Sequence, residues 1–561
     1  MHFDEKRLSN EFFCFLSKKF LYNQRKDVLS VLDKRIIAVF AAFCMTVGCL
    51  CLRLYVLSSS GTELVSSEPH YSSFTLGNIR GQILDCKGRK ITDSDYENRI
   101  VAKPTIKSLD TLRELLDSRT YTSIKKRMEN GSPITVNINK QRTASNGDIL
   151  CVPIYKRYSS AQPAVHILGY LDEEYHGVTG IEKAFDNILY SDESITARVP
   201  VDAYGRSLNG AKIELNYGSP NVGEVRLTVD LDIQKTVENA LDKCGINEGC
   251  AIVADVKSGA IKAIASRPAY DPYRISDYLG SESSPLLNRS LESFAVGSIF
   301  KVAVAACAIE NGVSDFKYTC NGSCKIGDVT FGCSSNTSHG KVDLQKALEK
   351  SCNTYFINLG QKLGSKKLSE TASLLGFGQG NVLCDGIEAE SGVLPSADDL
   401  INPAALANFS FGQGNFTATP IQIVEMLCAV GNGGKYSRPY LVDTVKDRSG
   451  KAEKHTDKYP TVAMSEETSE LLLKMLTSVV ENGNASPAKP ESFSAAGKTA
   501  TAQTGIFDRN GNEICNTWFG GIFPSDNPRY VAVIMKQGGS SGSYDCAPVF
   551  KMIADGINFS E

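Results

Sequence analysis

The sequence predicts an α+β fold, and three observations in its second half support this prediction. Two apolar strand patterns flank a Lys-Ser-Gly turn within residues 249–266, the middle of the segment carries helical patterns, and strand patterns return from residue 494 onwards. Strands at both ends with helices between them indicate a single sheet that is closed by the two ends of the segment.

An uncharged apolar run lies near the N-terminus, over residues 36–52, and residues 54–57 extend it past Arg53. This length suits a helix that crosses a bilayer. Basic residues gather before the run, which puts the N-terminal tail in the cytoplasm. A cleaved signal peptide is the alternative, but a charged leader of 35 residues and the lack of an A-x-A site favour an anchor. We therefore expect a cytoplasmic tail (1–35) and a transmembrane anchor (36–57) ahead of an extracytoplasmic part.

The extracytoplasmic part divides into two expected domains. Residues 58–224 mix short alternating runs with many turn residues, which predicts a mainly β or mixed domain. At residues 225–241 a strand pattern changes to a helix pattern, and we place the boundary just before it. The second domain (225–561) carries a helical run that stops at Gly312, further helices around 343–363 and 465–483, and the final strands.

Three short motifs in the second domain could carry chemistry. Ser298 and Lys301 lie three apart at the start of an apolar helix, so both side chains share one face. Burial would depress the pKa of that lysine and let it take the serine proton. Ser351 and Asn353 form a Ser-x-Asn motif, and Lys498 begins a Lys-Thr-Ala-Thr strand of small residues. Taken singly, each motif is also explained by a helix cap or a solvated lysine.

The order and spacing of the motifs are more specific than any one of them, because together they form a recognised triple signature. The chain here resembles the monofunctional, membrane-anchored class B penicillin-binding proteins, of the division or sporulation type. The resemblance spans residues 78–555 and includes the runs NRSLESFAVGSIFK, HGKVDLQKALEKSCNTYFINLGQKLG, SFGQGNFTATPIQ and AAGKTATAQTG. Upstream, IRGQILDCKGRKI and HILGYLDEEYHGVTGIEKAFDNIL resemble the start and end of the pedestal domain of that family.

The resemblance implies a peptidoglycan D,D-transpeptidase that cross-links stem peptides through an acyl-serine and is inhibited by β-lactams. It implies that Ser298 attacks the penultimate D-alanine and that Lys301 accepts the serine proton. Ser351 would relay a proton to the leaving amine, and Asn353 would hold the lysine and the donor amide. Lys498 would supply positive charge to the terminal carboxylate and keep the other lysine deprotonated.

The same resemblance implies that the substrate lies along residues 498–503 as an added strand. Thr499 and Thr501 would add hydroxyls, and the backbone N–H groups of Ser298 and Thr501 would form the oxyanion hole. The family usually has glycine where this chain has Ala500. A methyl group there could crowd a bulky donor, so we expect retained activity with an altered β-lactam preference.

Seventeen scattered cysteines do not indicate a small disulfide scaffold. Cys320, Cys324, Cys333 and His339 have the spacing C-x3-C-x8-C-x5-H, which is within reach of zinc chemistry. A loop disulfide or simple thiols are the favoured interpretations, and no step of the implied reaction needs a metal. Cys352 is interpreted as a small helix residue rather than a second nucleophile. We expect no metal and no cofactor.

Two other functions built on the same residues stay open. A serine β-lactamase or penicillin sensor is one, although a full pedestal argues against the lactamase and a short tail against the sensor. A non-catalytic scaffold in wall synthesis is the other. The net charge of −3, with both signs mixed, argues against nucleic acid. Residues 58–225 contain no glycosyltransferase block, so we expect a partner glycosyltransferase and divisome-type membrane proteins, with a role in septal or spore wall synthesis.

Overall fold

A five-stranded antiparallel sheet forms the centre of the second half of the chain. The order of its strands is β10-β9-β25-β24-β23. The strands are β9 (Gly249–Asp255), β10 (Ile261–Arg267), β23 (Ala496–Phe507), β24 (Glu513–Phe523) and β25 (Tyr530–Gln537). Because β25 pairs with β9, the two ends of the segment close one sheet, and the predicted α+β fold is confirmed. This computed structural model describes residues 34–56, 58–59, 70–138, 146–456 and 459–559.

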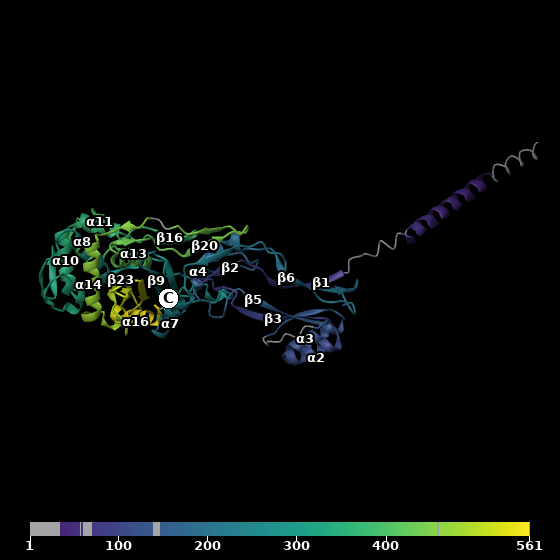
Figure 1. Ribbon diagram of the computed structural model, residues 1–561, viewed down its shortest axis with the longest axis horizontal. Helices are drawn as coiled ribbons and strands as arrows, with labels where there is room; N and C mark the ends of the chain where they lie inside the picture. Colours follow the sequence, from purple (N-terminus) through teal and green to yellow (C-terminus); the bar gives the residue numbers. More distant parts are fainter. Residues whose placement is uncertain (1–33, 57, 60–69, 139–145, 457–458, 560–561) are drawn as a thin grey trace, which may run out of the picture.

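Helices cover both faces of this sheet (Figure 1). Gly520 and Gly521 are neighbours in β24, so they face opposite sides. A Cβ on Gly520 would meet Ile423 of helix α13, whereas one on Gly521 would meet Phe550 of helix α16. The first face carries α13 (Pro420–Gly431) and α14 (Glu466–Asn482), and the second carries α7 (Leu231–Lys243) and α16 (Ala547–Gly556). Helix α8 (Lys301–Glu310) packs against α14.

Helix α13 shows how the sequence specifies the layer beneath the sheet. It begins at a capping box in which Thr419 and Gln422 satisfy each other's backbone N–H groups, with Pro420 in the first turn. Every residue from Pro420 to Val430 is buried. A helix that is apolar on all sides belongs in a core, and this one packs against β9, β24 and β25.

The remaining helices and small sheets surround this core. The helices are α9 (Leu344–Glu349), α10 (Asn353–Leu363), α11 (Ser365–Leu374), α12 (Pro403–Phe409) and α15 (Gly542–Asp545), with 3-10 turns η1 (Ile275–Tyr278), η2 (Gly297–Phe300), η3 (Ser334–Asn336) and η4 (Ser486–Ala488). The paired strands are β11 (Phe294–Ala295) with β18 (Thr417–Ala418), β12 (Tyr318–Cys320) with β15 (Gly340–Val342), β13 (Ser323–Ile326) with β14 (Val329–Gly332), β16 (Asn381–Cys384) with β17 (Ile387–Ala389), and β19 (Lys435–Tyr436) with β22 (Thr461–Val462). The helical pattern predicted around 343–363 is therefore two helices, α9 and α10, separated by residues 350–352.

The first half of the chain forms two smaller sheets that extend away from the helical end (Figure 1). One contains β1 (His70–Asn78), β6 (Ser194–Val201) and β7 (Glu214–Asn216), and the other contains β3 (Asp95–Ala102), β4 (Ile134–Ile138) and β5 (Ile149–Lys156). The helices here are α2 (Ile106–Leu115), α3 (Ser118–Glu129), α4 (Val165–Leu168), α5 (Gly180–Ala184) and α6 (Asp186–Leu189).

A fourth sheet joins the two halves of the chain. Strand β2 (Gln82–Leu84) runs parallel to β8 (Glu224–Leu227), which in turn pairs with β20 (Val442–Lys446) and, through it, β21 (Ala452–Lys454). The boundary expected between residues 224 and 225 falls at the start of β8. The division into a pedestal (58–224) and a second domain (225–561) stays a prediction.

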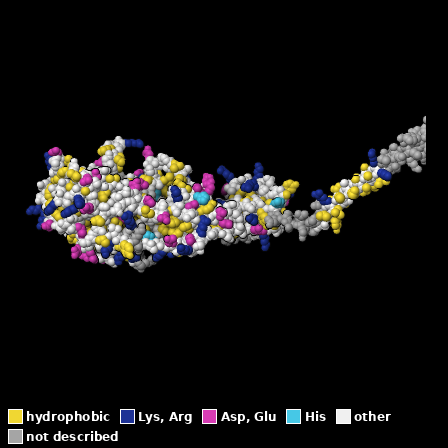
Figure 2. All heavy atoms as spheres, turned by 90° about the horizontal axis from the view of Figure 1, so that it is seen from above, with side chains coloured by type: hydrophobic (Ala, Val, Ile, Leu, Met, Phe, Trp, Pro, Cys, Tyr) yellow, Lys and Arg dark blue, Asp and Glu magenta, His cyan; other side chains and the backbone are white. Residues whose placement is uncertain are grey.

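One helix near the N-terminus, Lys34–Val56, is long and apolar enough to cross a membrane. It has 23 residues and a mean hydropathy of 2.2, and none of it is buried by the rest of the chain. Figure 2 shows apolar side chains along this helix, with basic side chains at its ends. Over most of its length it coincides with the predicted anchor (36–57); residue 57 and residues 1–33 of the expected tail lie outside the described residues.

A buried ion network holds the segments next to the joining sheet together. Glu182 is fully buried between Arg80 (2.7 Å) and Arg157 (2.6 Å), which also reach Asp186 (2.7 Å) and Asp93 (2.8 Å). Burial alone would raise the pKa of Glu182, but the charges and hydrogen bonds of the two arginines outweigh it and lower that pKa. The carboxylate is therefore charged and compensates two buried guanidinium groups.

Replacing Glu182 by glutamine should destabilise the chain strongly, because both arginines would lose their buried counter-charge. We expect Glu182→Gln to lower the free energy of unfolding by about 3–5 kcal/mol. Glu129→Gln is the control, since Glu129 pairs with Lys125 at 3.8 Å on the surface and should change it by less than about 1 kcal/mol. Urea denaturation of the full chain in detergent, followed by circular dichroism, measures both. Equal decreases in the free energy of unfolding for the two variants would contradict the role of Glu182 as a buried counter-charge.

Candidate active site

Ser298 lies in the 3-10 turn η2, immediately before helix α8. Its neighbour Gly297 has φ +66°, and a Cβ there would lie 3.0 Å from the carbonyl oxygen of Thr501. Gly297 also donates its N–H to the carbonyl of Gly412 at 2.8 Å. Only glycine fits this conformation and this close approach, which sets Ser298 beside strand β23. The serine is partly exposed, and no described residue forms a hydrogen bond with its hydroxyl.

Lys301 is the first residue of α8 and is completely buried. Its Nζ donates to the carbonyl oxygen of Ser351 (2.9 Å) and to Oδ1 of Asn353 (2.6 Å), and it lies 3.2 Å from Ser351 Oγ. Ser351 sits in the break between α9 and α10 with φ +52°. This left-handed conformation ends one helix and turns the serine towards the lysine, so the site residues Lys301, Ser351 and Asn353 come together as predicted by their motifs.

Lys498 reaches the same hydroxyl from the sheet. It is completely buried in β23, and its Nζ lies 3.1 Å from Ser351 Oγ and 3.1 Å from the carbonyl oxygen of Thr499. The Ser351 hydroxyl is thus held between two lysine amines. A hydroxyl has two acceptor lone pairs and one donor, so it can accept from one amine and donate to the other.

The two lysines cannot both carry a full charge in this position. Burial lowers the pKa of Lys301 to about 7, against the opposing influence of Cys352 and Cys333. Burial, together with the charge of Lys301, also lowers the pKa of Lys498 well below its usual range. Near neutral pH the site therefore holds an amine that can accept a proton, which a surface lysine does not offer.

Strand β23 is an edge of the central sheet, and its free edge faces η2. The carbonyls of Thr499 and Thr501 point to this edge, since they approach Lys498 Nζ and Gly297 respectively. In an antiparallel strand the N–H and C=O of one residue point the same way, so the Thr501 N–H also faces the edge. The edge can pair with an added extended peptide, with the Thr501 side chain exposed beside it.

Ala500 behaves differently from the sequence-based expectation of crowding. It is 3% exposed, and its methyl group is part of the hydrophobic core. The methyl is therefore covered by protein rather than presented at the free edge of β23. An altered β-lactam preference stays a prediction, but its steric reason would have to act through the packing beneath the strand.

Trp518 connects the segment before Ser298 to the central sheet, a role that none of the three sequence motifs indicates. It is fully buried in β24, opposite Ala500, and its indole N–H donates to the carbonyl of Ala295 at 3.0 Å. Ala295 ends β11, three residues before Ser298. The indole therefore ties the segment that carries the serine to the sheet that carries Lys498. A lone tryptophan in the last strands was the available signal, but the sequence does not reveal its partner.

A sulfur-rich cluster lies directly behind Ser351 and Asn353. The Sγ atoms of Cys320, Cys333 and Cys352 and a ring nitrogen of His339 all lie within 4.8 Å of one another. Cys324, which the spacing grouped with them, is elsewhere: it lies in β13 and packs against Ile357 and its apolar neighbours. Sequence reasoning therefore chose three of the four members and missed Cys352.

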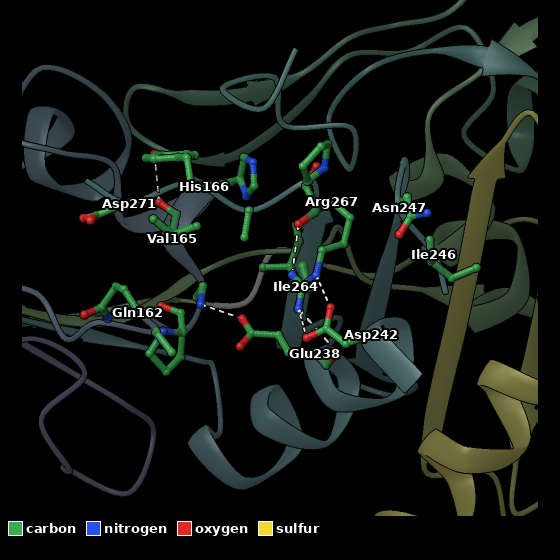
Figure 3. A pocket seen from close by; sticks show the side chains of 18 of the residues that line it. Gln162, Val165, His166, Glu238, Asp242, Ile246, Asn247, Ile264, Arg267 and Asp271 are labelled. Atoms are coloured by element: carbon green, nitrogen blue, oxygen red, sulfur yellow. Dashed lines mark hydrogen bonds and ion pairs between the residues drawn. The ribbon is translucent and has the colours of Figure 1, made fainter. Parts of the chain in front are cut away.

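One cavity in the described part of the chain contains none of the predicted site residues. It measures about 980 Å³ and lies where α4 meets α7 and β10 (Figure 3). Glu238 accepts the N–H of Ala164 at 2.8 Å in its wall, and Arg267 pairs with Asp242 at 2.6 Å. Burial raises the pKa of Glu238. Its residues come from both halves of the chain, and none of them belongs to the three sequence motifs.

Comparison with known proteins agrees with this geometry. Residues 249–555 match the family described as penicillin binding protein transpeptidase domain. Stage V sporulation protein D of Bacillus subtilis is 28% identical over 496 residues, which cover 82% of this chain and 74% of that protein. Peptidoglycan D,D-transpeptidase PbpA of Mycolicibacterium smegmatis is 28% identical over 421 residues, 70% of this chain and 82% of that one. Penicillin binding protein 3 of Mycobacterium tuberculosis, solved in complex with ampicillin, has a TM-score of 0.61 at 22% identity and covers 86% of this chain and 95% of its own.

Removing the indole donor should loosen the segment that carries Ser298. We expect Trp518→Phe to lower the free energy of unfolding by about 1–3 kcal/mol, because the carbonyl of the partly buried Ala295 would lose its partner. Tyr459→Phe, at a fully exposed aromatic residue, should change it by no more than about 0.5 kcal/mol. Denaturant midpoints from circular dichroism compare the two. A Trp518→Phe chain as stable as the control would refute the anchoring role.

Proposed function

The chain belongs to the penicillin-binding protein transpeptidase family, and from that premise we propose that it cross-links peptidoglycan stem peptides through an acyl-serine on Ser298. One observation carries the proposal: the Ser351 hydroxyl lies between two buried lysine amines, Lys301 and Lys498, beside a partly exposed serine and the free edge of β23. A proton acceptor, a proton relay and a docking edge are what acyl transfer by serine requires.

The acylation step follows from these positions. Ser298 Oγ attacks the carbonyl carbon of the penultimate D-alanine, and its proton passes to neutral Lys301. The N–H groups of Ser298 and Thr501 stabilise the negative charge that develops on the carbonyl oxygen. When the C–N bond breaks, the proton returns through Ser351 to the nitrogen of the leaving D-alanine. Asn353 holds Lys301 in place through its Oδ1.

The donor peptide would lie along β23 as an added strand. Its terminal carboxylate would approach Lys498, whose charged form it would favour, and the hydroxyl of Thr501, with Thr499 and Ala500 forming the strand itself. An amine of a neighbouring stem peptide then attacks the ester, forms the cross-link and releases Ser298. Rapid attack by water on a penicilloyl ester of Ser298 would instead indicate a β-lactamase, and a site that fails to acylate would leave a scaffold.

The location and partners follow from the N-terminal helix and from the relatives. The helix Lys34–Val56 would anchor the chain once, with the tail in the cytoplasm and both larger domains outside. Because one relative is named a stage V sporulation protein, spore wall synthesis is the favoured role, with septal synthesis as the alternative. A membrane glycosyltransferase would supply the glycan strands.

Penicillin should acylate Ser298 alone. We expect intact-mass and peptide mass spectrometry of the full chain in detergent to find one adduct that persists for hours. Ser298→Ala should abolish it, whereas Ser486→Ala should not, although Ser486 begins another Ser-x-x-Lys on an exposed turn. An adduct that disappears within minutes would favour the lactamase. No adduct with several β-lactam classes would favour the scaffold.

The rate of acylation should depend on pH through Lys301. Only the neutral amine accepts the serine proton, so the rate should rise about tenfold per unit below pH 7 and level off above it, in line with a pKa of about 7. The groups that face Lys301 are Lys498, whose own pKa the charge of Lys301 lowers, and Cys333 and Cys352, which raise the pKa of Lys301.

Lys498→Gln tests this assignment because Lys498 is the second amine at the Ser351 hydroxyl. The charge of Lys301 lowers the pKa of Lys498, so Lys498 should already be neutral where Lys301 titrates. The acidic limb should therefore stay near pH 7 in Lys498→Gln, whereas the fixed charge of Lys498→Arg should move it to lower pH. Acylation by a fluorescent penicillin, measured from pH 5 to about 9, gives the profiles. An acidic limb that moves to higher pH in Lys498→Gln would mean that Lys498 is charged where Lys301 titrates.

A further inference from the structure

We propose that Cys320, Cys333, His339 and Cys352 bind a zinc ion directly behind the active site. The cluster combines three buried sulfurs with a partly exposed imidazole, and their ligating atoms are gathered within 4.8 Å. Three sulfurs and one nitrogen form a donor set that zinc prefers in structural sites. The ion is not required by the acyl-transfer chemistry proposed above, and the site stands on its own geometry.

Three of the six distances within the cluster match the edges of a zinc tetrahedron, and the other three are at most 4.8 Å. With Zn–S bonds of about 2.3 Å and a Zn–N bond of about 2.0–2.1 Å, neighbouring sulfurs lie about 3.8 Å apart and sulfur and nitrogen about 3.5 Å apart. The structure has 3.7 Å between the sulfurs of Cys320 and Cys333, and 3.8 Å between those of Cys333 and Cys352. Cys320 Sγ lies 3.4 Å from His339 Nδ1.

The same distances disfavour a disulfide as the reason for the cluster. A disulfide needs sulfurs about 2.05 Å apart, and the three cysteines are free in this structure. A bond between any two would also leave the third thiol and the histidine without a role. A single ion uses all four groups.

The surroundings of the sulfurs are those of metal-bound thiolates. The N–H of Gly322 points to Cys320 Sγ at 3.4 Å, and Thr354 Oγ1 lies 3.4 Å from Cys352 Sγ. Such donors stabilise negative sulfur and orient the ligands. On binding, each thiol would release its proton to solvent, so three thiolates, a neutral imidazole and Zn²⁺ would leave a net charge of −1. That charge is far cheaper to bury than three thiolates without the ion.

The ion would fix the loop that carries two proposed catalytic residues. Cys352 stands between Ser351 and Asn353, and the Asn353 side chain also donates to the carbonyl of Gly332, next to Cys333. Ser351 has φ +52°, a conformation that costs a non-glycine residue about 1–2 kcal/mol and needs support from its surroundings. The ligands come from the end of β12, the loop after β14 and the start of α10, so one ion would tie these segments together.

Metal content tests the site without reference to activity. The full chain, purified in detergent without chelators, should contain about one zinc per chain by mass spectrometry. In a separate control sample the free thiols are blocked on lysis. After chelation, added Co²⁺ should give the visible bands of a tetrahedral site and a thiolate charge-transfer band, and Zn²⁺ should displace it.

Variants assign the ligands. Cys333→Ser and His339→Ala should weaken zinc binding by more than the roughly 10–100-fold that loss of a mere supporting residue costs. Cys324→Ser is the matched control, because Cys324 lies in the adjacent hairpin and faces away, and it should keep full zinc content. Should Cys333→Ser fail to fold, the cobalt spectrum of the wild-type and Cys324→Ser chains still decides the question.

Several results would overturn the proposal. They are a wild-type chain without zinc or cobalt binding, iron in place of zinc, equal losses in Cys324→Ser, and a disulfide between two of the three cysteines in the thiol-blocked sample. The effect on acylation rests on the proposed function and is read separately. A zinc-loaded chain that penicillin never acylates would count against the function alone, and a zinc-free chain with an unchanged acylation rate would count against the metal site alone.

Discussion

The site depends on the burial of two lysine amines against one serine hydroxyl. Each amine lies within 3.2 Å of Ser351 Oγ, so the two nitrogens are separated by about 6 Å at most. At an effective dielectric constant of about 20, two unit charges at that distance repel by about 3 kcal/mol, which corresponds to about two pK units. Desolvation adds to this. The pair therefore favours one neutral amine near neutral pH, and the fold must hold both side chains in place to keep it so.

The rest of the domain supplies that restraint from three directions. Helix α8 fixes Lys301, the edge strand β23 fixes Lys498, and the break between α9 and α10 presents Ser351 to both. The indole of Trp518 connects the first two of these directions, because it lies in the sheet and binds the segment before η2. Lys301 and Lys498 are both completely buried, so the distances between the groups are a property of the core packing rather than of a surface loop.

The central sheet, the main helices and the three motifs could be predicted from the sequence, because strand and helix periodicity and the order of the motifs can be read along the chain. It missed what depends on contacts between distant segments. The run around 343–363 looked like one helix because its apolar spacing continues across residues 350–352, and only the tertiary contacts of Ser351 break it. Similarly, Cys324 was grouped with Cys320 by proximity in sequence, whereas the β13–β14 hairpin turns it towards Ile357. Cys352, nineteen residues beyond Cys333, takes the place in the cluster.

Ser351 lies between the lysine pair of the active site and the sulfur cluster behind it. Its left-handed backbone would be unfavourable in isolation, yet it is the conformation that turns its hydroxyl towards the lysines. On one side Lys301 binds its carbonyl oxygen, and on the other the next residue, Cys352, joins the sulfur cluster. A cysteine at the middle of the Ser-x-Asn motif is thus more than a small helix residue. It places an anchor for the loop at the one position that is covalently next to both Ser351 and Asn353, where a small displacement of either would alter the hydrogen bonds that hold Lys301.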